Sequence, residues 1–224
     1  MSIGSIFQAG RVAAFAVTVV AAVIACRPAE AHPHVMVTAA AIVNVEQEAI
    51  QSITHVWTFD EFYTAQALDG LPKNKDGLYG REELAELAKV NVEGLKEFNY
   101  FTFASIDKTE LKVGDPKPGD YWLEHKDGVL SLHFTIPLER PLPLKTKGFG
   151  FVVTDPSYFI AFEMAPKDAA KLNAGAPTSC KIAVVEQKET EEEKSLGGAF
   201  SQQMSAATMF GIGPPKRIEV DCNG

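Results

Sequence analysis

The sequence predicts an α+β protein: an antiparallel, sandwich-like β-sheet body with an inserted EF-hand-like helix–loop–helix. Two patterns support this fold class. Apolar residues alternate with period two in the first strands and after residue 100, and they recur with helical spacing between about residues 60 and 98. The composition agrees, because 46% of the 224 residues are hydrophobic and 22% are charged. We expect residues 32–224 to form one domain.

The N-terminus has the pattern of an export signal, which we assign to residues 1–31. A cation precedes the apolar run Val12–Ala25, which is shorter than the ~20 residues that a membrane-spanning helix needs. Ala29 and Ala31 place small residues at the two positions that a signal peptidase reads. Cleavage there would leave His32 as the N-terminus of a periplasmic protein without a transmembrane segment. The alternative is a lipoprotein anchored through Cys26.

The first part of the body is predicted to be a β-hairpin followed by a helix. Val35–Val45 and Ile50–Thr58 are rich in β-forming residues and flank a short polar turn. Thr58 and Glu61 have the spacing of a capping box, with Thr58 as the N-cap. We therefore expect a helix over about Asp60–Leu71.

A second helix is predicted over about Glu82–Phe98, because apolar residues that would face the core recur there at three- and four-residue spacing; they are Leu84, Leu87, Ala88, Leu95 and Phe98. The connection between the two helices aligns with a calcium loop. Asn74, Asp76 and Glu83 occupy positions three, five and twelve, but position one, normally Asp, is Pro72. The loop is therefore a degenerate EF-hand-like loop, and we do not expect it to bind calcium with useful affinity.

A hairpin around Asp127-Gly128 begins the second part of the body. Its register pairs His125 with Leu130 and Trp122 with His133, and directly opposed residues share a face. The two histidines should therefore point to opposite faces and should not bind the same ion.

Several shorter segments complete the expected body. The further predicted strands are Gly148–Thr154, Ser157–Met164, Lys181–Glu186 and Arg217–Cys222. Three prolines, Pro137, Pro141 and Pro143, predict a connection outside the sheet, since proline cannot donate to a ladder. The charged residues 186–194 are expected to be a solvated loop, and residues 196–210 are weakly helical.

Two of the 3 cysteines, Cys180 and Cys222, remain after removal of the export signal. An even number of cysteines in an exported protein predicts a disulfide, and two separate buried thiols are the alternative. On the chain-entropy account, a loop of this span would stabilise the fold by about 4 kcal/mol.

The segment His32-Pro33-His34 is the sharpest candidate for chemistry. The α-amine and imidazole of a terminal His32 can chelate a metal, and the imidazole of His34 can join them; such nitrogens suit nickel, cobalt, zinc or copper. Pro33 has no N–H, which excludes a square-planar site built on deprotonated amides. His55 is a candidate third ligand, with a hydrogen-bonded histidine at the core edge as its alternative. A frayed terminus with two solvated histidines is the alternative to a metal site.

Composition and motifs exclude other classes of function. The net charge of −8 disfavours a nucleic-acid binder and an electrostatic membrane binder. The chain has no G-x-S-x-G, no H-E-x-x-H and no glycine-rich phosphate loop. We therefore do not expect an enzyme.

The ordered motifs of the chain resemble the DUF1007 family, a family of unknown function described as an uncharacterised periplasmic component of ABC-type transport systems. The pieces that carry the resemblance are Ala31–Val35, Trp57–Phe62, Asn74-x-Asp76-Gly77 with Glu83-Leu84, Tyr100-Phe101, Asp155–Phe159, and Gly175–Pro177 before Cys180. The departure is Pro72, where the family tends to have an acidic residue.

The resemblance implies a role beside a transporter, because members are often encoded next to nickel/cobalt-type permeases. It implies no catalytic residue. We therefore expect a periplasmic accessory protein that binds a transition metal near its N-terminus and serves an inner-membrane metal permease or ABC-type transporter. The alternative is a non-metal, non-catalytic interaction module for a membrane transporter.

Overall fold

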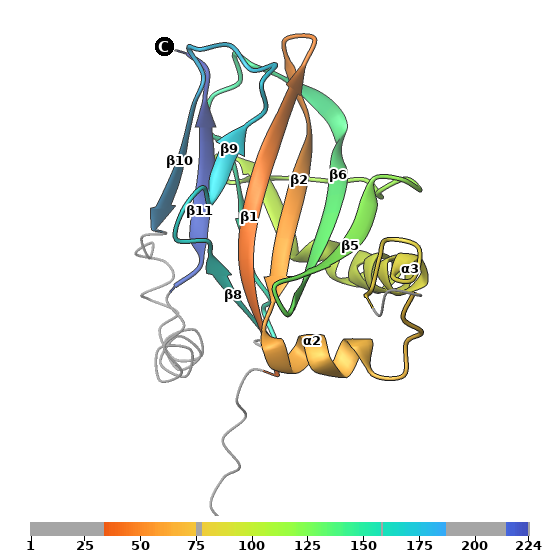
Figure 1. Cartoon of the computed structure of the whole chain (residues 1–224). Helices are drawn as coiled ribbons and strands as arrows, with labels where there is room; N and C mark the ends of the chain where they lie inside the picture. Colours follow the sequence, from red (N-terminus) through yellow and green to blue (C-terminus); the bar gives the residue numbers. More distant parts are fainter. Residues whose placement is uncertain (1–33, 75–77, 158, 187–213, 224) are drawn as a thin grey trace, which may run out of the picture. The chain divides into compact units, whose positions relative to one another are not determined.

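The computed structural model describes residues 34–74, 78–157, 159–186 and 214–223 (Figure 1), which all belong to one compact unit. The predicted signal peptide, Cys26, His32 and Asp76 lie outside the described residues. The elements, in chain order, are β1 Val35–Glu46, β2 Ala49–Phe59, α2 Glu61–Leu68, α3 Ala85–Leu95, the 3₁₀ helix η1 Lys96–Phe101, β3 Thr102–Ile106, β4 Thr109–Leu111, β5 Tyr121–Lys126, β6 Val129–Pro143, β7 Phe149–Val153, β8 Ile160–Met164, β9 Ala170–Leu172, β10 Lys181–Glu186 and β11 Lys216–Asp221.

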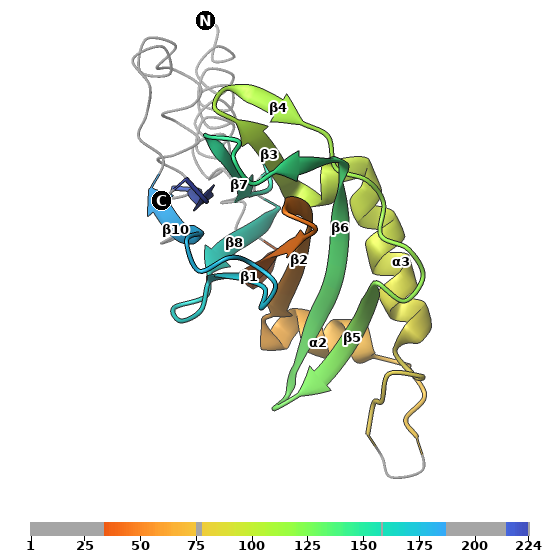
Figure 2. The ribbon, with the colours of Figure 1, turned by 90° about the horizontal axis from the view of Figure 1, so that it is seen from above.

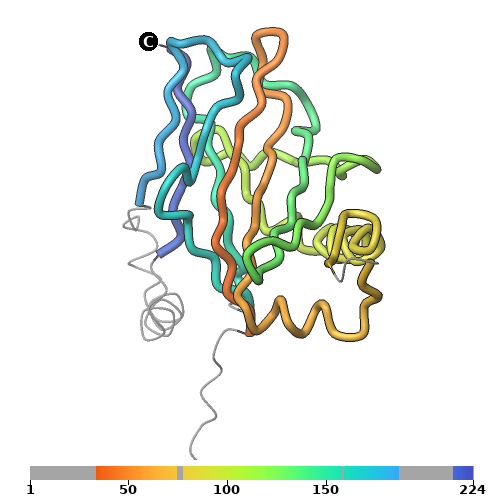
Figure 3. The backbone as a smooth tube through the Cα atoms, viewed as in Figure 1, coloured from red at the N-terminus to blue at the C-terminus, as the bar shows by residue number. Residues whose placement is uncertain are grey.

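The strands form two sheets, which confirms a β-rich α+β architecture. The first sheet has the order β5-β6-β2-β1-β8, with β9 also paired to β1, and the second has the order β10-β11-β7-β3-β4. Most ladders are antiparallel, as expected, but β8 and β9 run parallel to β1. Figure 3 shows β1 between β2 on one side and the β8–β9 segment on the other. The first sheet is therefore mixed.

The β1–β2 hairpin is confirmed, and its residues explain it. Every second residue of β1 is buried, which matches the alternation of apolar and polar side chains. Gln47 and Glu48 close the hairpin with φ values of 50° and 60°, as a tight two-residue turn between twisted strands requires. The buried face of this hairpin forms one side of the core.

The core lies where the two sheets meet. His55 on β2 contacts Phe151 on β7, with ring centroids 6.2 Å apart, and Trp57 contacts Phe101 at 6.5 Å. Phe134 on β6 packs edge-to-face against Trp57 at 4.8 Å. These aromatic side chains are almost completely buried.

The first helix is confirmed, but its predicted cap was wrong. The N-cap of α2 is Asp60, whose side chain accepts a hydrogen bond from the Tyr63 amide at 2.7 Å. Thr58 remains in β2, where its hydroxyl bonds to the Ser131 hydroxyl at 2.9 Å. The ladder with β6 extends to this pair, so the helix can begin only after the ladder ends.

The second helix is shorter than predicted. It begins at Ala85 and ends at Leu95, where η1 continues the chain. Ala88 and Val92 are its buried residues. In Figure 2, α3 runs beside β5 and β6, and Figure 1 shows α2 at one end of the same sheet. Helix α3 contacts β5, and α2 contacts β6.

The prediction that Pro137, Pro141 and Pro143 form a connection outside the sheet is wrong. Strand β6 includes all three prolines and ends at Pro143. The Pro137 carbonyl accepts a hydrogen bond from the Gly114 amide at 2.7 Å. In an antiparallel strand the N–H and C=O of one residue point to the same side, so the missing N–H of Pro137 faces the residue 112–114 segment rather than β2. The β2–β6 ladder therefore tolerates this proline.

The predicted disulfide between Cys180 and Cys222 is present. Cys180 precedes β10 and Cys222 follows β11, and the two strands pair Lys181 with Asp221. The bond therefore closes the end of this two-strand ladder. Among the described helices, none has the length and apolar character needed to cross a membrane.

Candidate functional site

Three segments that are distant in sequence meet at the start of β1. The His34 amide donates to the Phe159 carbonyl at 2.9 Å, just before β8. The Met36 amide donates to the Asp60 carboxylate at 2.8 Å, and the Asp60 amide donates to the Met36 carbonyl at 3.0 Å. Backbone hydrogen bonds to Phe159 on one side and to Asp60 on the other therefore fix the chain just after the predicted mature N-terminus.

The His34 side chain is exposed at this junction. Its ring lies 4.7 Å from the ring of Phe159, at an interplanar angle of 32°. This contact orients the imidazole and leaves it accessible to a ligand.

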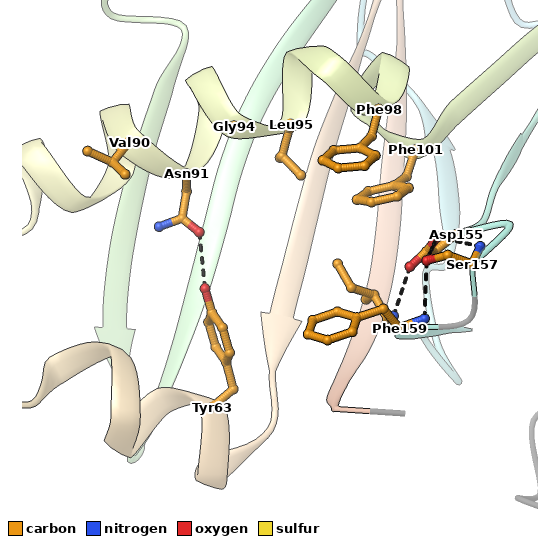
Figure 4. Close-up of a pocket in the computed structure, with 11 residues that line it drawn as sticks. Tyr63, Val90, Asn91, Gly94, Leu95, Phe98, Phe101, Asp155, Ser157 and Phe159 are labelled. Atoms are coloured by element: carbon orange, nitrogen blue, oxygen red, sulfur yellow. Dashed lines mark hydrogen bonds between the residues drawn. The ribbon is translucent and has the colours of Figure 1, made fainter. Parts of the chain in front are cut away.

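Next to this junction lies an apolar groove with a volume of about 610 Å³. Figure 4 shows its three borders, which are α2, the α3–η1 stretch and the segment from Asp155 to Ile160. The lining residues are Tyr63, Val90, Asn91, Gly94, Leu95, Phe98, Phe101, Asp155, Ser157, Phe159 and Ile160. We refer to this set below as the α2–α3 groove.

Large apolar side chains of the α2–α3 groove are exposed. The exposed fractions are 56% for Val90, 55% for Phe98 and 54% for Phe159. Phe98 stacks on Phe101 with ring centroids 5.2 Å apart, so it is held in place although one face is open. Such a cluster of exposed large apolar side chains is typical of a binding surface.

The polar groups of α2 and α3 that line the groove already have partners. The Tyr63 hydroxyl donates to the Asn91 side-chain oxygen at 3.1 Å, and the Asn91 side-chain nitrogen donates to the Leu87 carbonyl at 2.8 Å. Burial raises the pKa of the Tyr63 phenol above its usual value. Tyr63 therefore acts as a neutral link between α2 and α3.

Asp155 is buried in the wall of the groove, and its carboxylate accepts three hydrogen bonds. The donors are the Ser157 amide at 2.8 Å, the Ser157 hydroxyl at 2.7 Å and the Ile160 amide at 2.9 Å. This network stabilises the turn at Pro156 and Ser157. The carboxylate shapes the wall and is not an available general base.

The charges around the groove are mostly negative. Helix α2 has no Lys or Arg, and Glu61 and Asp69 at its two ends are exposed. On the α3–η1 stretch, Glu86, Glu93 and Glu97 are exposed. Glutamates at these positions neighbour Val90 and Gly94 at three- and four-residue spacing.

The structure does not bring His55 to His34. His55 pairs with Ala41 on β1, seven residues from His34, which corresponds to about 23 Å along a strand. The two imidazoles cannot bind the same ion, so the expected third ligand is not available. Among the described residues, no group of three or more His, Cys, Asp or Glu side chains could hold a metal. His32 lies outside them.

His55 instead is a buried core residue, as its alternative interpretation held. Its Nε2 lies 3.1 Å from the Thr102 hydroxyl, which donates to the Tyr100 carbonyl at 2.9 Å. Because that hydroxyl has a single proton, Nε2–H is the donor to Thr102. Burial lowers the pKa of His55 to about 3, and the ring is neutral at physiological pH.

The predicted hairpin register of His125 and His133 is confirmed. Trp122 pairs with His133 and His125 pairs with Leu130. His133 stacks on Trp122 at 4.7 Å, and burial lowers the pKa of His133. His125 instead lies against Tyr79 at 5.5 Å. The two histidines have different neighbours on opposite faces.

Two residues of the calcium-like loop accept backbone hydrogen bonds. The Asn74 side-chain oxygen accepts from the Leu78 amide, and the Glu83 carboxylate accepts from the Gly80 amide, both at 2.9 Å. Glu83 precedes α3 rather than lying in it. These contacts brace the loop between the helices.

Sequence reasoning missed the α2–α3 groove. The apolar spacing of the second helix predicts that Phe98 faces the core, and the predicted strand Ser157–Met164 includes Phe159, yet both side chains are exposed. The available signal was the set of ordered motifs, because His34, Asp60 and Asp155–Phe159 belong to three of them and meet here.

Comparison with known proteins agrees with the resemblance. The model of a family described as "Protein of unknown function (DUF1007)" matches residues 17–222. The chain is also similar to an "Uncharacterized protein" of Haemophilus influenzae, with 21% identity over 193 residues that span 86% of this chain and 91% of that protein. This chain therefore belongs to the DUF1007 family.

Proposed function

We propose that this protein is a non-catalytic periplasmic accessory component of a transport system that binds a transition-metal ion at its mature N-terminus. The observation that carries the proposal is the position of His34. Its imidazole is exposed, and its backbone is fixed to Phe159, two residues after the N-terminus that cleavage behind Ala31 would create.

The proposed ligands are the α-amine and imidazole of His32 together with the imidazole of His34. These nitrogens suit nickel, cobalt, zinc or copper. Three protein ligands leave coordination positions open to water or to a partner. Such a site fits a protein that passes an ion to or from an inner-membrane metal permease or ABC-type transporter.

The disulfide between Cys180 and Cys222 supports an oxidising compartment, since disulfides persist there and are rare in the cytosol. The signal pattern of residues 1–31 makes the periplasm our proposed location, with anchoring through Cys26 as the alternative. We treat the two sheets as a sandwich-like body and the α2–α3 unit as a degenerate EF-hand-like scaffold. Asn74 and Glu83 already accept backbone hydrogen bonds, which argues against calcium.

Isothermal titration of the correctly processed protein with nickel, cobalt, copper and zinc tests the proposal. We expect one ion per chain, with affinity lost in His34→Ala and in a variant with one extra residue before His32. His125→Ala is the matched control, because that histidine is on β5. Binding that survives both N-terminal changes would falsify the terminal chelate. Native mass spectrometry of the same sample identifies its first residue.

A non-metal interaction module is the second candidate, and the α2–α3 groove favours it. A measurement of how much of the protein associates with membranes of the cells that express it, with and without metal, separates the two functions. An accessory metal protein loses metal-dependent association in His32→Ala and His34→Ala variants, whereas a pure interaction module retains all of its association.

A further inference from the structure

We propose that the α2–α3 groove binds an apolar, positively charged segment of a partner polypeptide. This inference goes beyond the metal site at the N-terminus and does not depend on it. It rests on the shape of the groove, on the glycine in the middle of its helical wall and on the charges at its borders.

The groove has the dimensions of a polypeptide segment. Its helical wall runs from Val90 to Phe98, which corresponds to about 12 Å of helix. That length matches anchors at positions i, i+3 or i+4 and i+7 of an amphipathic helix. Val90, Phe98 and Phe159 are each more than half exposed, so they can receive such anchors without a rearrangement of the core.

Gly94 points to a groove that is kept open. It lies within α3 and lines the groove, and a Cβ built on it would meet no atom within 4 Å. Packing therefore does not require a glycine here, although glycine inside a helix is less stable than alanine. The missing side chain leaves space between Asn91 and Phe98 on the groove wall (Figure 4).

The charges at the borders select the partner. Glu61 and Asp69 lie at the ends of α2, and Glu86, Glu93 and Glu97 follow the other wall. Of the two lysines on that wall, Lys89 is exposed and Lys96 bonds to Asp115, which does not line the groove. An apolar groove with acidic borders is complementary to a segment that carries Lys or Arg beside its apolar anchors.

The same charges disfavour two other occupants. A second copy of the chain docked groove to groove would bring its acidic borders against those of the first copy. An anionic lipid surface would be repelled for the same reason.

Selection from a random peptide library of about 16 residues, displayed on phage, tests the proposal on the processed full chain. Gly94→Trp serves for counter-selection, because its indole extends into the groove from a site where a Cβ meets no neighbour within 4 Å. We expect the enriched peptides to be apolar with an excess of Lys and Arg. A synthetic copy of the strongest peptide is then titrated by fluorescence anisotropy.

Point variants locate the binding site. We expect Gly94→Trp and Phe98→Ser to weaken the peptide at least about tenfold, and the double change Glu93→Lys with Glu97→Lys to weaken it and to reduce its salt dependence. Phe62→Ser is the matched control, because Phe62 is 78% exposed on α2 but does not line the groove. Circular dichroism confirms that each variant is folded.

Three results overturn the proposal: no enrichment above Gly94→Trp, enriched peptides that are acidic or uncharged, and affinity that is unchanged in Phe98→Ser. Sedimentation is run in parallel, and a dimer lost in Gly94→Trp shows that a second copy fills the groove. The peptide should still bind to the His34→Ala variant. A failure of the proposed metal site can therefore be distinguished from a failure of the proposed peptide site in the groove.

Discussion

The core around His55 and the surface around His34 contain the same side-chain types in opposite situations. In the core, His55 stacks on Phe134 at 4.9 Å, and both residues are completely buried. At the surface, the ring of His34 lies tilted against that of Phe159 with centroids 4.7 Å apart, and both residues are exposed. The first pair stabilises the fold and cannot meet a ligand, whereas the second is available for binding. The different roles of these two histidine–phenylalanine pairs therefore come from burial and not from residue type.

The largest expected effect separates the two regions by stability. Phe134→Ala should lower the free energy of unfolding by about 3–5 kcal/mol, because it leaves a cavity among completely buried rings. Phe98→Ala should cost less than about 1 kcal/mol, since that ring is 55% exposed. Urea denaturation of both variants measures the difference, and equal losses would contradict the distinction between core and groove.

The second expected effect is a loss of folding stability in acid, caused by the buried ring of His55. The pKa of His55 is about 3 in the folded protein, against 6.5 as its ordinary value, so the unfolded chain binds the proton first as the pH falls. The stability from the neutral ring is complete above pH 6.5 and is lost as the pH falls toward 3, at up to about 1.4 kcal/mol per pH unit. Denaturation midpoints at several pH values test this.

The control for the acid experiment uses two glutamine variants. His55→Gln should flatten the dependence of stability on pH in this window, because the titrating group is gone. His125→Gln should keep the steep dependence, since the buried ring of His55 is intact. An acid slope that is unchanged in His55→Gln would assign the effect to another group.

A smaller loss of stability is expected from changes at Asp60, which connects the start of β1 to helix α2. Asp60→Ala removes the N-cap of α2 and the acceptor of the Met36 amide, and it should cost about 1–2 kcal/mol. Asp60→Asn should recover most of this loss, because asparagine is also a good N-cap. Hydrogen exchange at the Met36 and Tyr63 amides localises the change; protection that persists in Asp60→Ala would be evidence against the cap.

The smallest expected effect is a gain. Gly94→Ala should stabilise α3 by about 0.5–1 kcal/mol, because it lowers the entropy of the unfolded chain and meets no neighbour within 4 Å. Gly70→Ala is the matched control: its surroundings are equally open, but its φ is +74°, so alanine should destabilise there. A loss of stability in Gly94→Ala would show that the glycine is needed for packing.

Local patterns predicted the regular parts of the fold well. The Asp127-Gly128 turn predicted the pairing of Trp122 with His133, since a two-residue turn sets the register of both strands. Alternation predicted β1, β2, β10 and β11 to within one or two residues. The even number of cysteines that remains after removal of the export signal predicted the disulfide between Cys180 and Cys222. Each of these inferences depends on neighbours along the chain or on a single covalent option.

The same reasoning failed where contacts or chain direction beyond the local pattern decided the outcome. Thr58 and Asp60 are both good N-caps, and the ladder with Ser131 decided between them. Pro137 reads as a strand breaker, but its missing N–H faces the residue 112–114 segment. Helical spacing placed Phe98 with the core, although the chain turns at η1 and leaves the ring exposed.

The sequence by itself determined that this is an acidic chain with β-rich periodicity, an export pattern, a predicted disulfide and histidines just after the expected cleavage site. These properties reside in composition, periodicity and short motifs. Only the tertiary structure decided that His55 is a neutral core residue, that His34 is accessible, and that α2, α3 and the Asp155–Ile160 segment enclose a groove. The physical reason is that burial and proximity depend on strands and helices far apart in the chain, and no local pattern records which of them meet.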